Sequence, residues 1–407
     1  MGINYVIVTD RASYDNYVEM FQDFPNICQQ YKTYFVGFPQ VCASAGQHRF
    51  GQLRMIKDCF LRSLAITKIS RCEDVDLILY PSEDMRGVLT SYLSSLFSSK
   101  PWTAIFQPGP VLNCPNLFKG TISLRPLNPF NILAHINQEE EARNYSLSSK
   151  IGLGIEFLLL LKIAEKTVIL TVSESVVEDL SYLNPRIRIL PIIPGNGIDL
   201  SEFSEVPQKM SYQGIFFGRM IPGKGFNDLI EIWKRVVKEI PHAKLAICGI
   251  EEDPKILQNF IKEVRRQKLD TNIEVLGQQD RVHLFDVIRK SYLTINPSYE
   301  DSFSLVILES LASGTPVVSY NLPACERNFS RCTSVLRCPV GDMTNMSDKI
   351  LQTLTQYSRE DLRVEAKRFA ASYDLRNVVI AEKNAYILVK SDFKKWQCMR
   401  SKENGLS

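Results

Sequence analysis

The chain has 407 residues, of which 45% are apolar and 23% charged, with 20 glycines and 20 prolines. At about 150 residues per domain this length predicts two or three globular domains, and the composition excludes a disordered, fibrous or small disulfide-stapled protein. The 48 basic and 45 acidic side chains leave a net charge of +3. So small a charge gives no bulk attraction for nucleic acid, and we expect no nucleic-acid partner.

Residues 1–15 run directly into an apolar, strand-like stretch, without the basic segment and cleavage site of a secretory signal. The most apolar window, residues 151–172, carries charged side chains at Glu156, Lys162, Glu165 and Lys166. A membrane-spanning helix needs a long uncharged run. We therefore expect no spanning helix and a cytoplasmic protein.

In the first half, β-branched runs at 4–8, 31–38, 76–80, 102–106 and 167–172 alternate with longer helical patterns. This alternation is typical of a parallel α/β sheet. The ten cysteines include no C-x2-C pair, so they predict no zinc site. We expect the closest group, Cys325, Cys332 and Cys338, to be thiols, with one disulfide among them as the alternative.

Residues 49–71 contain six basic side chains and one acidic one, with an apolar side made of Leu53, Ile56, Phe60, Leu64 and Ile66. We expect a helix that packs this apolar side into the core and leaves the basic face in solvent. The alternative is a peripheral contact with the inner face of an anionic membrane.

Residues 194–208 are rich in proline, glycine and short polar side chains, as expected of a linker. We place a domain boundary there, giving domains at 1–204 and 205–374 and a helical tail at 375–407. In the second domain, strands are predicted at 212–218, 244–249, 272–277, 293–296, 315–320 and 333–337. The best helix is 227–240, where Leu229, Ile230, Trp233, Val236, Val237 and Ile240 follow helical spacing.

The segment 216–226, FFGRMIPGKGF, places Gly218, Arg219 and Lys224 between a strand and a helix. Two cations near a helix N-terminus suit a diphosphate. Gly225 stands where a P-loop requires Ser or Thr, so we reject that motif. The alternative is a tight turn whose cations are simply solvated.

The segment 296–320 places Glu300 and Asp301 in a loop before a helix that we expect to begin near Ser304, with Ser302 as its N-cap. Glu309 lies further along the same helix. First-turn N–H groups can bind phosphate, and nearby carboxylates can accept hydroxyl hydrogens. The combination suits a sugar nucleotide; the alternative is exposed carboxylates without a ligand.

Together, GRMIPGKGF, LAICG, NIEVLG and EDSFSLVILESLASGTPVV resemble the nucleotide-binding domain of retaining glycosyltransferases, in particular glycosyltransferase family 4. The resemblance covers most of 167–322, with TVSES (171–175) and PGNGIDLSEF (194–203) on its first-half side. It implies the α/β GT-B fold, in which two Rossmann-like, doubly wound domains face a central cleft. It also implies an N-terminal acceptor domain, a C-terminal donor domain, and a tail that crosses back to the first.

By the same resemblance, Arg219 and Lys224 hold the donor diphosphate, Glu309 binds the ribose, and Asp301 contacts the transferred sugar. Gly218 and the backbone of Phe303, Ser304 and Leu305 approach the donor. This sequence departs from the family at two places: Asp301 stands where Glu is usual, with Glu300 one position out, and Ser304 stands where Gly is usual. Both departures concern the sugar contact more than the diphosphate contact.

No cofactor is expected beyond a UDP- or GDP-linked sugar as co-substrate, and no metal. The sole Asp-x-Asp tripeptide, Asp74 to Asp76, precedes a strand, at the wrong end for a site. Gln107 stands near the place where the family often has a first-domain His, and His48 is a weak catalytic candidate. The Gly-rich acceptor loop of the family is also missing, with SAGQ (44–47) a weak substitute.

The sequence therefore predicts an enzyme, a metal-independent, retaining hexosyltransferase that uses a nucleotide sugar and a glycan, lipid-linked or protein acceptor. The alternatives are a non-catalytic sugar-nucleotide or glycan-binding protein and a sugar-nucleotide epimerase on the same fold.

Overall fold

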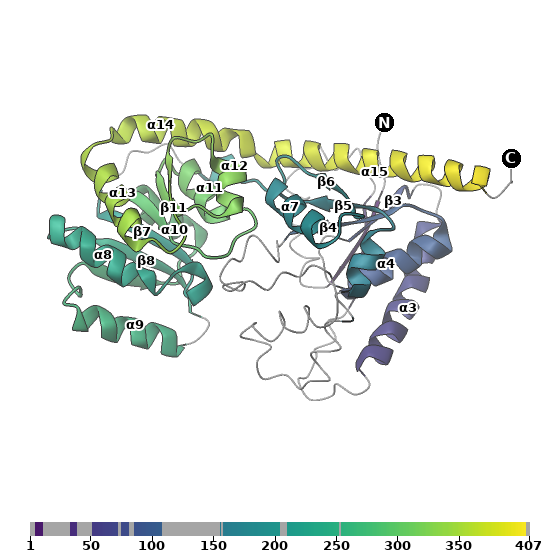
Figure 1. The fold of residues 1–407 in the computed structure, drawn as a ribbon, viewed down its shortest axis with the longest axis horizontal. Helices are drawn as coiled ribbons and strands as arrows, with labels where there is room; N and C mark the ends of the chain where they lie inside the picture. Colours follow the sequence, from purple (N-terminus) through teal and green to yellow (C-terminus); the bar gives the residue numbers. More distant parts are fainter. Residues whose placement is uncertain are drawn as a thin grey trace.

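A computed structural model of the chain describes residues 5–10, 33–38, 51–71, 75–80, 85–107, 155, 158–203, 210–251 and 254–403. It contains two six-stranded sheets, each with helices packed against it (Figure 1). Every strand pair in both sheets is parallel. The α/β class and the two doubly wound sheets predicted from the sequence are confirmed.

The first sheet has the strand order β2-β1-β3-β4-β5-β6. Its strands are β1 (Tyr5–Asp10), β2 (Thr33–Phe38), β3 (Leu77–Tyr80), β4 (Trp102–Phe106), β5 (Val168–Thr171) and β6 (Arg188–Pro191). The helices of this half include α3 (Gly51–Ser70), α4 (Met85–Ser98) and α7 (Glu174–Leu183), and residues 158–164 are also helical. Side chains of β4 alternate between two buried clusters, with Trp102, Ala104 and Phe106 in one and Ile105 in the other. The sheet is therefore covered on both faces, as parallel sheets require.

The second sheet has the strand order β12-β11-β10-β7-β8-β9. Its strands are β7 (Tyr212–Arg219), β8 (Leu245–Ile250), β9 (Ile273–Gly277), β10 (Ser291–Asn296), β11 (Val317–Tyr320) and β12 (Val335–Cys338). Phe216 of β7 faces one core cluster, and Ile215 and Phe217 face the other. Both faces of this sheet are therefore also buried.

The helices of the second half are α8 (Asp228–Glu239), α9 (Pro254–Arg266), α10 (Arg281–Arg289), α11 (Leu305–Ala312), α12 (Pro323–Phe329), α13 (Met343–Thr355) and α14 (Arg359–Ala370). Short 3-10 turns are η1 (Leu200–Glu202), η2 (Pro222–Lys224) and η3 (Ala371–Tyr373). Helix α8 buries Leu229, Ile230, Trp233 and Val236, which confirms the apolar face predicted from its spacing.

All five strands predicted in the first half and all six in the second are present. Strand β6 was not predicted from the sequence; it is an edge strand that pairs only with β5 among the described residues. Its segment alternates arginine with isoleucine and ends in Pro191, which is typical of an edge rather than a central strand. The predicted boundary near residue 205 lies outside the described residues, so the domain limits stay a prediction.

Helix α15 (Leu375–Glu403) follows η3 and runs along the first sheet (Figure 1). Its residues Ala385, Tyr386 and Val389 share a buried cluster with side chains of β3, β4 and β5. Lys390 Nζ also donates to Asp76 Oδ1 at 2.6 Å, just before β3. The chain thus returns from the second sheet to pack on the first.

Within the described residues, no helix combines the length and the apolar character needed to cross a bilayer. Cys325, Cys332 and Cys338 are free thiols, as predicted, and all three are buried. Burial raises the pKa of Cys325 and of Cys338 to about 12. These thiols are therefore poor nucleophiles at neutral pH.

The docking of α15 can be tested with two neighbouring residues, because Val389 is 2% exposed and Leu388 is 53% exposed. We expect Val389→Asp to lower the free energy of unfolding by about 3 kcal/mol, since it buries a carboxylate in an apolar cluster. The control Leu388→Asp should cost about 1 kcal/mol or less. Urea unfolding followed by circular dichroism measures both. Equal losses in the two variants would show that α15 does not pack on the sheet by this face.

Candidate functional site

The second sheet reverses its winding between β7 and β10. From β7 the chain continues outward to β8 and β9, and from β10 it continues the opposite way to β11 and β12. Because the connections diverge, the loops that leave two adjacent strands at such a switch point enclose space for a ligand at the carboxyl end of the sheet. Here those loops are residues 219–225 after β7 and 297–304 after β10.

Glycines let these two loops touch. Gly225 has φ +68°, and a Cβ on it would lie 1.9 Å from the carbonyl oxygen of Pro297. A Cβ on Gly223 would lie 2.6 Å from Glu300 Oε1. The Tyr299 N–H donates to the Gly223 carbonyl at 2.9 Å. No larger residue fits at Gly225 without displacing the other loop.

The second loop is also anchored to α8. The hydroxyls of Tyr299 and Tyr320 both donate to Asp228 Oδ2, at 2.5 and 2.9 Å. Desolvation and this acceptor raise the pKa of Tyr299 to about 12, so the phenol keeps its proton at neutral pH. Asp228 thus fixes the chain one residue before Glu300.

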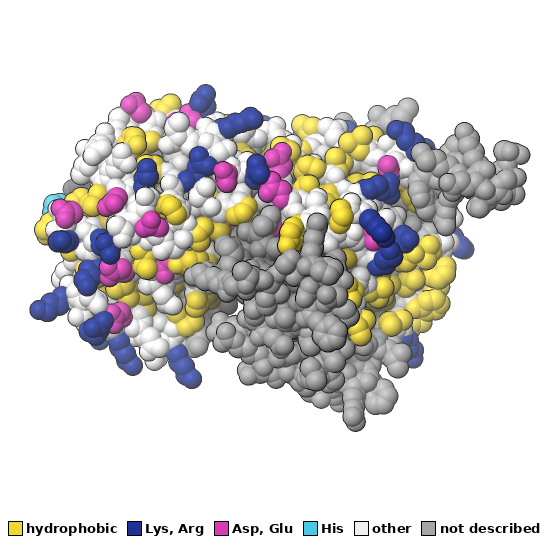
Figure 2. All heavy atoms as spheres, in the orientation of Figure 1, with side chains coloured by type: hydrophobic (Ala, Val, Ile, Leu, Met, Phe, Trp, Pro, Cys, Tyr) yellow, Lys and Arg dark blue, Asp and Glu magenta, His cyan; other side chains and the backbone are white. Residues whose placement is uncertain are grey.

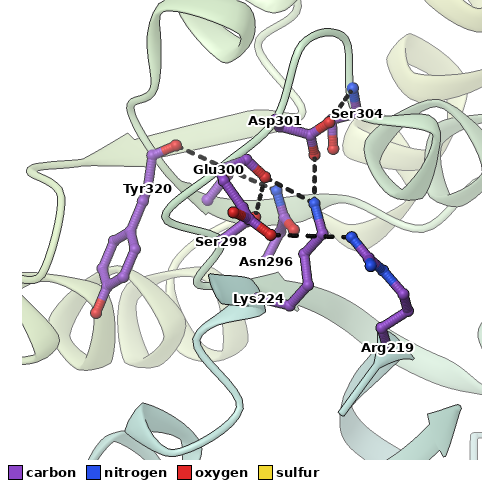
Figure 3. Close-up of polar contacts among 9 residues, drawn as sticks. Arg219, Lys224, Asn296, Ser298, Glu300, Asp301, Ser304 and Tyr320 are labelled. Carbon is purple, nitrogen blue, oxygen red and sulfur yellow. Dashed lines mark hydrogen bonds and ion pairs between the residues drawn. The ribbon is translucent and has the colours of Figure 1, made fainter. Parts of the chain in front are cut away.

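The two cations predicted from the sequence lie at this junction (Figure 3). Lys224 Nζ donates to the Glu300 carbonyl at 2.7 Å and lies 3.8 Å from Asp301 Oδ2. Arg219 Nη2 lies 3.8 Å from Glu300 Oε1. Ion pairs this long and partly exposed contribute little to stability. An anion of higher charge can therefore replace the carboxylates at small cost.

Helix α11 begins at the same place. Its N-cap is Ser304, with φ +77° and ψ +80°, and the Ser304 N–H donates to Asp301 Oδ1 at 3.0 Å. The predicted start of the helix is confirmed, but the prediction of Ser302 as N-cap is wrong. The carbonyl of Ser302 instead accepts a hydrogen bond from Ser173, as described below.

Ser304 is under local strain, because a positive φ is costly for a residue with a Cβ. Its hydroxyl is buried and has no hydrogen-bond partner among the described residues. Glycine, which the family resemblance expects here, would adopt this φ freely. The backbone therefore keeps the shape that a glycine would give it, and the serine accommodates that shape.

The other predicted donor contacts are backbone positions. The ring of Phe303 packs against Phe329 and Tyr373 at centroid distances of 5.5 and 5.6 Å, so its side chain belongs to the core. Gly218, with φ +141°, lies beside Gly249, where a Cβ would come within 1.8 Å of the Gly218 carbonyl oxygen. Leu305 is 47% exposed at the first turn of α11.

Glu309 lies further along α11. Its partner is Arg281, a residue that was not predicted from the sequence. Arg281, at the start of α10, lies 3.4 Å from Glu309 Oε1 and 2.6 Å from Glu202 Oε2 in η1. Burial raises the pKa of Glu309, Arg281 lowers it, and the charge of Glu202 raises it. Arg281 follows the carboxyl end of β9, and that position was the signal available in the sequence.

Elements of the first sheet reach the same loop. The hydroxyls of Ser173 and Ser175, at the start of α7, donate to the Ser302 carbonyl at 2.8 and 3.3 Å. Glu178 of α7 pairs with Arg327 of α12. Residues 171–175 resemble a family motif, but their contact with Ser302 could not be predicted, because pairing across 127 or more residues cannot be read from spacing.

The remaining candidates lie elsewhere. Asp76 pairs with Lys390, and Asp74, His48 and residues 44–47 lie outside the described residues. Gln107 is exposed and follows β4. Among the residues that the structure describes, no group of three or more His, Cys, Asp and Glu side chains is placed to hold a metal ion.

Residues 212–356 match the protein-family model described as Glycosyl transferases group 1. The chain is 34% identical over 110 residues to a poly(glycerol-phosphate) alpha-glucosyltransferase of Bacillus subtilis, which covers 27% of this chain and 16% of that protein. It is 23% identical over 234 residues to a glycogen synthase of Mycobacterium tuberculosis, 56% of each chain. The chain thus carries a domain of this family, and it spans about half or less of the length of these relatives.

The fold has solved counterparts. The crystal structure of Anabaena HepE in complex with UDP and glucose aligns with a TM-score of 0.63, at 12% identity, over 94% of this chain and 99% of that one. The crystal structure of a glycosyltransferase from Rickettsia africae aligns with a TM-score of 0.66, at 13% identity, over 95% of this chain and 98% of that one. These likenesses and the two parallel sheets establish the GT-B fold.

The contact between the two loops can be tested with a matched pair of glycines. Gly225 and Gly277 have nearly the same φ, +68° and +70°, but a Cβ on Gly277 would meet nothing within 4 Å. Gly277→Ala should cost about 1–2 kcal/mol for the positive φ alone. Gly225→Ala carries the same strain plus the clash with Pro297, so we expect a clearly larger loss of stability. Thermal unfolding measures the difference, and equal melting temperatures would contradict the close approach.

Proposed function

We propose that the protein is a retaining glycosyltransferase of family 4, which transfers a hexosyl group from a UDP- or GDP-linked sugar to an acceptor hydroxyl without a metal ion. The observation that carries the proposal is the meeting of two cations, Arg219 and Lys224, with the start of α11 at the switch point of the second sheet. Cations and helix N-termini both favour phosphate. The match of residues 212–356 to the Glycosyl transferases group 1 model supports the same reading.

The donor diphosphate would replace the carboxylates that now face the two cations. Lys224 Nζ already lies 2.7 Å from a carbonyl of the opposite loop, so its direction is fixed before a ligand arrives. As the bond to the sugar breaks, negative charge grows on the leaving phosphate. Fixed cations lower the energy of that charge without reorganising. This is the role we assign to Arg219 and Lys224.

The ribose and the transferred sugar of the donor would contact other residues around the same two loops. Glu309, whose side chain is 15% exposed, would accept hydrogen bonds from the ribose hydroxyls. Asp301 would contact the transferred sugar, next to the backbone of Phe303, Ser304 and Leu305. The solved neighbours include HepE in complex with UDP and glucose, which supports a UDP-type donor.

Retention needs no protein nucleophile in this proposal. The leaving phosphate, held by Arg219 and Lys224, takes the proton of the acceptor hydroxyl as that oxygen bonds to the anomeric carbon on the same face. The protein then acts by orientation and charge stabilisation. Ser173 and Ser175, which hold the Ser302 carbonyl from the first sheet, would fix the loop during this step.

A binding experiment tests the donor site. We expect UDP or GDP to raise the melting temperature of the wild type, and Lys224→Ala to weaken binding about tenfold to a hundredfold, the value of a hydrogen bond to a charged group. Lys234→Ala, an exposed lysine on α8, is the control and should bind like the wild type. The donor site is refuted if no nucleoside diphosphate or nucleotide sugar stabilises the wild-type chain.

Turnover is then measured as release of nucleoside diphosphate from the sugar nucleotide that binds best, with acceptor extracts, in the presence and absence of EDTA. Release that persists with EDTA and yields an α-glycoside from an α-linked donor fits the proposal. Binding with no release under any acceptor would favour the non-catalytic alternative.

The pH dependence of donor binding gives a second test with two opposite variants. Glu309 must be ionised to accept two hydroxyl hydrogens, so affinity falls as the pH drops through its pKa. Arg281→Gln removes the charge that lowers this pKa and should move the acid limb to higher pH. Glu202→Gln removes a charge that raises it and should move the limb to lower pH. Isothermal titration calorimetry of donor binding from pH 4 to 8 measures the pH at which affinity falls in each variant. If this pH moved in the same direction in both variants, Glu309 would be excluded as the titrating group.

A further inference from the structure

Helices α3 and α4 pack against each other through small side chains. The buried residues of α3 include Cys59, Ser63, Thr67 and Ser70, and those of α4 include Gly87, Ser91, Ser94 and Ser95. Ser94 Oγ lies 3.4 Å from the Ser63 carbonyl on the opposite helix. Small residues at a helix interface let the two backbones approach closely.

Most of the buried hydroxyls bond to carbonyls of their own helix; Ser95 donates to the Lys100 carbonyl just after α4, and Ser91 Oγ has no partner among the described residues. Ser63, Thr67 and Ser70 donate to carbonyls three or four residues earlier, at 2.6 to 2.7 Å. Thr90 and Ser94 do the same on α4. The contact between the two helices is therefore made largely by small side chains whose hydroxyls are mostly bonded within the pair.

Several large apolar side chains of the same helices are exposed. Ile56, Phe60, Leu61 and Leu64 of α3 are 44–53% exposed, and Leu96 and Phe97 of α4 are 56% and 38% exposed. We name these six residues the α3–α4 face. The rings of Phe60 and Phe97 meet edge to face at 5.9 Å, so the face is continuous across both helices.

This arrangement corrects the sequence prediction. The apolar side of residues 49–71 was expected to pack in the core, and only Ile66 of its described members does so, at 0% exposed. Ile56, Phe60 and Leu64 lie on the surface instead. The pair also buries Ile66, Met85, Val88 and Leu89 in the core. Its exposed Ile, Phe and Leu side chains therefore form a second apolar side beyond the one that the core covers, and an exposed apolar patch of this kind marks an interaction surface.

Basic residues on α3 and α4 indicate what kind of partner the α3–α4 face would bind. Lys57, Arg62, Lys68 and Arg71 belong to or directly follow α3, and α4 carries Arg86 and no acidic residue. Asp58 is the single acidic residue in the sequence of α3, and no Asp or Glu follows between Cys59 and Arg71. Figure 2 shows apolar and basic side chains gathered over the part of the molecule where Figure 1 places α3 and α4. Apolar side chains flanked by lysine and arginine suit a surface with an apolar interior and anionic headgroups.

We propose that the α3–α4 face docks on the surface of an anionic lipid bilayer, with its apolar side chains in the headgroup region and its basic side chains on the lipid phosphates. A second copy of the chain fits the face poorly, because a two-fold contact would bring the same basic residues together. The proposal concerns a surface of the first sheet and does not depend on the donor site.

Vesicle co-sedimentation of the full chain tests the proposal. We expect binding to vesicles of 70% phosphatidylcholine and 30% phosphatidylglycerol at about 50 mM salt, and much weaker binding to pure phosphatidylcholine or at about 500 mM salt, where charges are screened. The variant Leu61→Gln/Leu64→Gln should lower the partition coefficient about tenfold or more. Lys57→Gln/Lys68→Gln should lower it about thirtyfold at low salt, as expected for two cations near an anionic surface.

The control is Val364→Gln on α14, an equally exposed apolar residue at 54%, which should bind vesicles like the wild type. All three variants should keep the wild-type melting temperature, since the changed side chains are exposed. The proposal is overturned if the wild type does not bind anionic vesicles at low salt, or if Leu61→Gln/Leu64→Gln binds as well as the wild type. Light scattering completes the test: a wild-type dimer that this variant dissociates would assign the face to a second copy instead.

Discussion

The carbonyl oxygen of Pro297 comes so close to Gly225 that a Cβ there would lie 1.9 Å away, and the candidate site depends on this contact. It joins the loop after β7 to the loop after β10. Lys224 precedes that glycine and can therefore reach the Glu300 carbonyl at 2.7 Å. Parallel strands bring many loops to one edge of a sheet, but only at a switch point do two of them diverge enough to leave room for a ligand.

The carboxylates beside the two cations are held loosely enough for a ligand to displace them. Glu300 and Asp301 each lie 3.8 Å from a cation, so neither pair is a tight ion pair. Asp301 also caps the start of α11, because its other oxygen accepts the Ser304 N–H at 3.0 Å. A phosphate that displaces Asp301 from Lys224 would thus leave the helix cap intact. The shorter Asp in place of the usual Glu supports this double role, since one oxygen can stay on the cap while the other faces the ligand.

The strands and helices that follow a strong period could be predicted from the sequence, and the contacts between distant segments could not. Helix α8 shows a clear apolar stripe, and its buried residues match it. Edge strand β6 has no such pattern, because its side chains are only partly buried and its segment alternates arginine with isoleucine. In the candidate site, Arg219, Lys224 and Asp301 were predicted from their positions between a strand and a helix and from the resemblance. Arg281 was missed, because its partners lie 28 and 79 residues away in the sequence. Spacing also cannot say which side of an amphipathic helix faces inward, as α3 shows.

The carboxylate proposed for the ribose shares its cation with the segment that links the two sheets. Arg281 lies closer to Glu202, at 2.6 Å, than to Glu309, at 3.4 Å. Glu202 comes four residues after Ile198, which pairs with Asp374 where the chain returns to the first sheet. A ligand that takes up an oxygen of Glu309 weakens the longer of these two contacts and leaves the shorter one in place. Arg281 therefore keeps its contact with Glu202, beside the two segments that link the sheets, while Glu309 exchanges Arg281 for the ribose. The site is thus positioned before the ligand binds, and the ion pair between Arg281 and Glu309 does not block it.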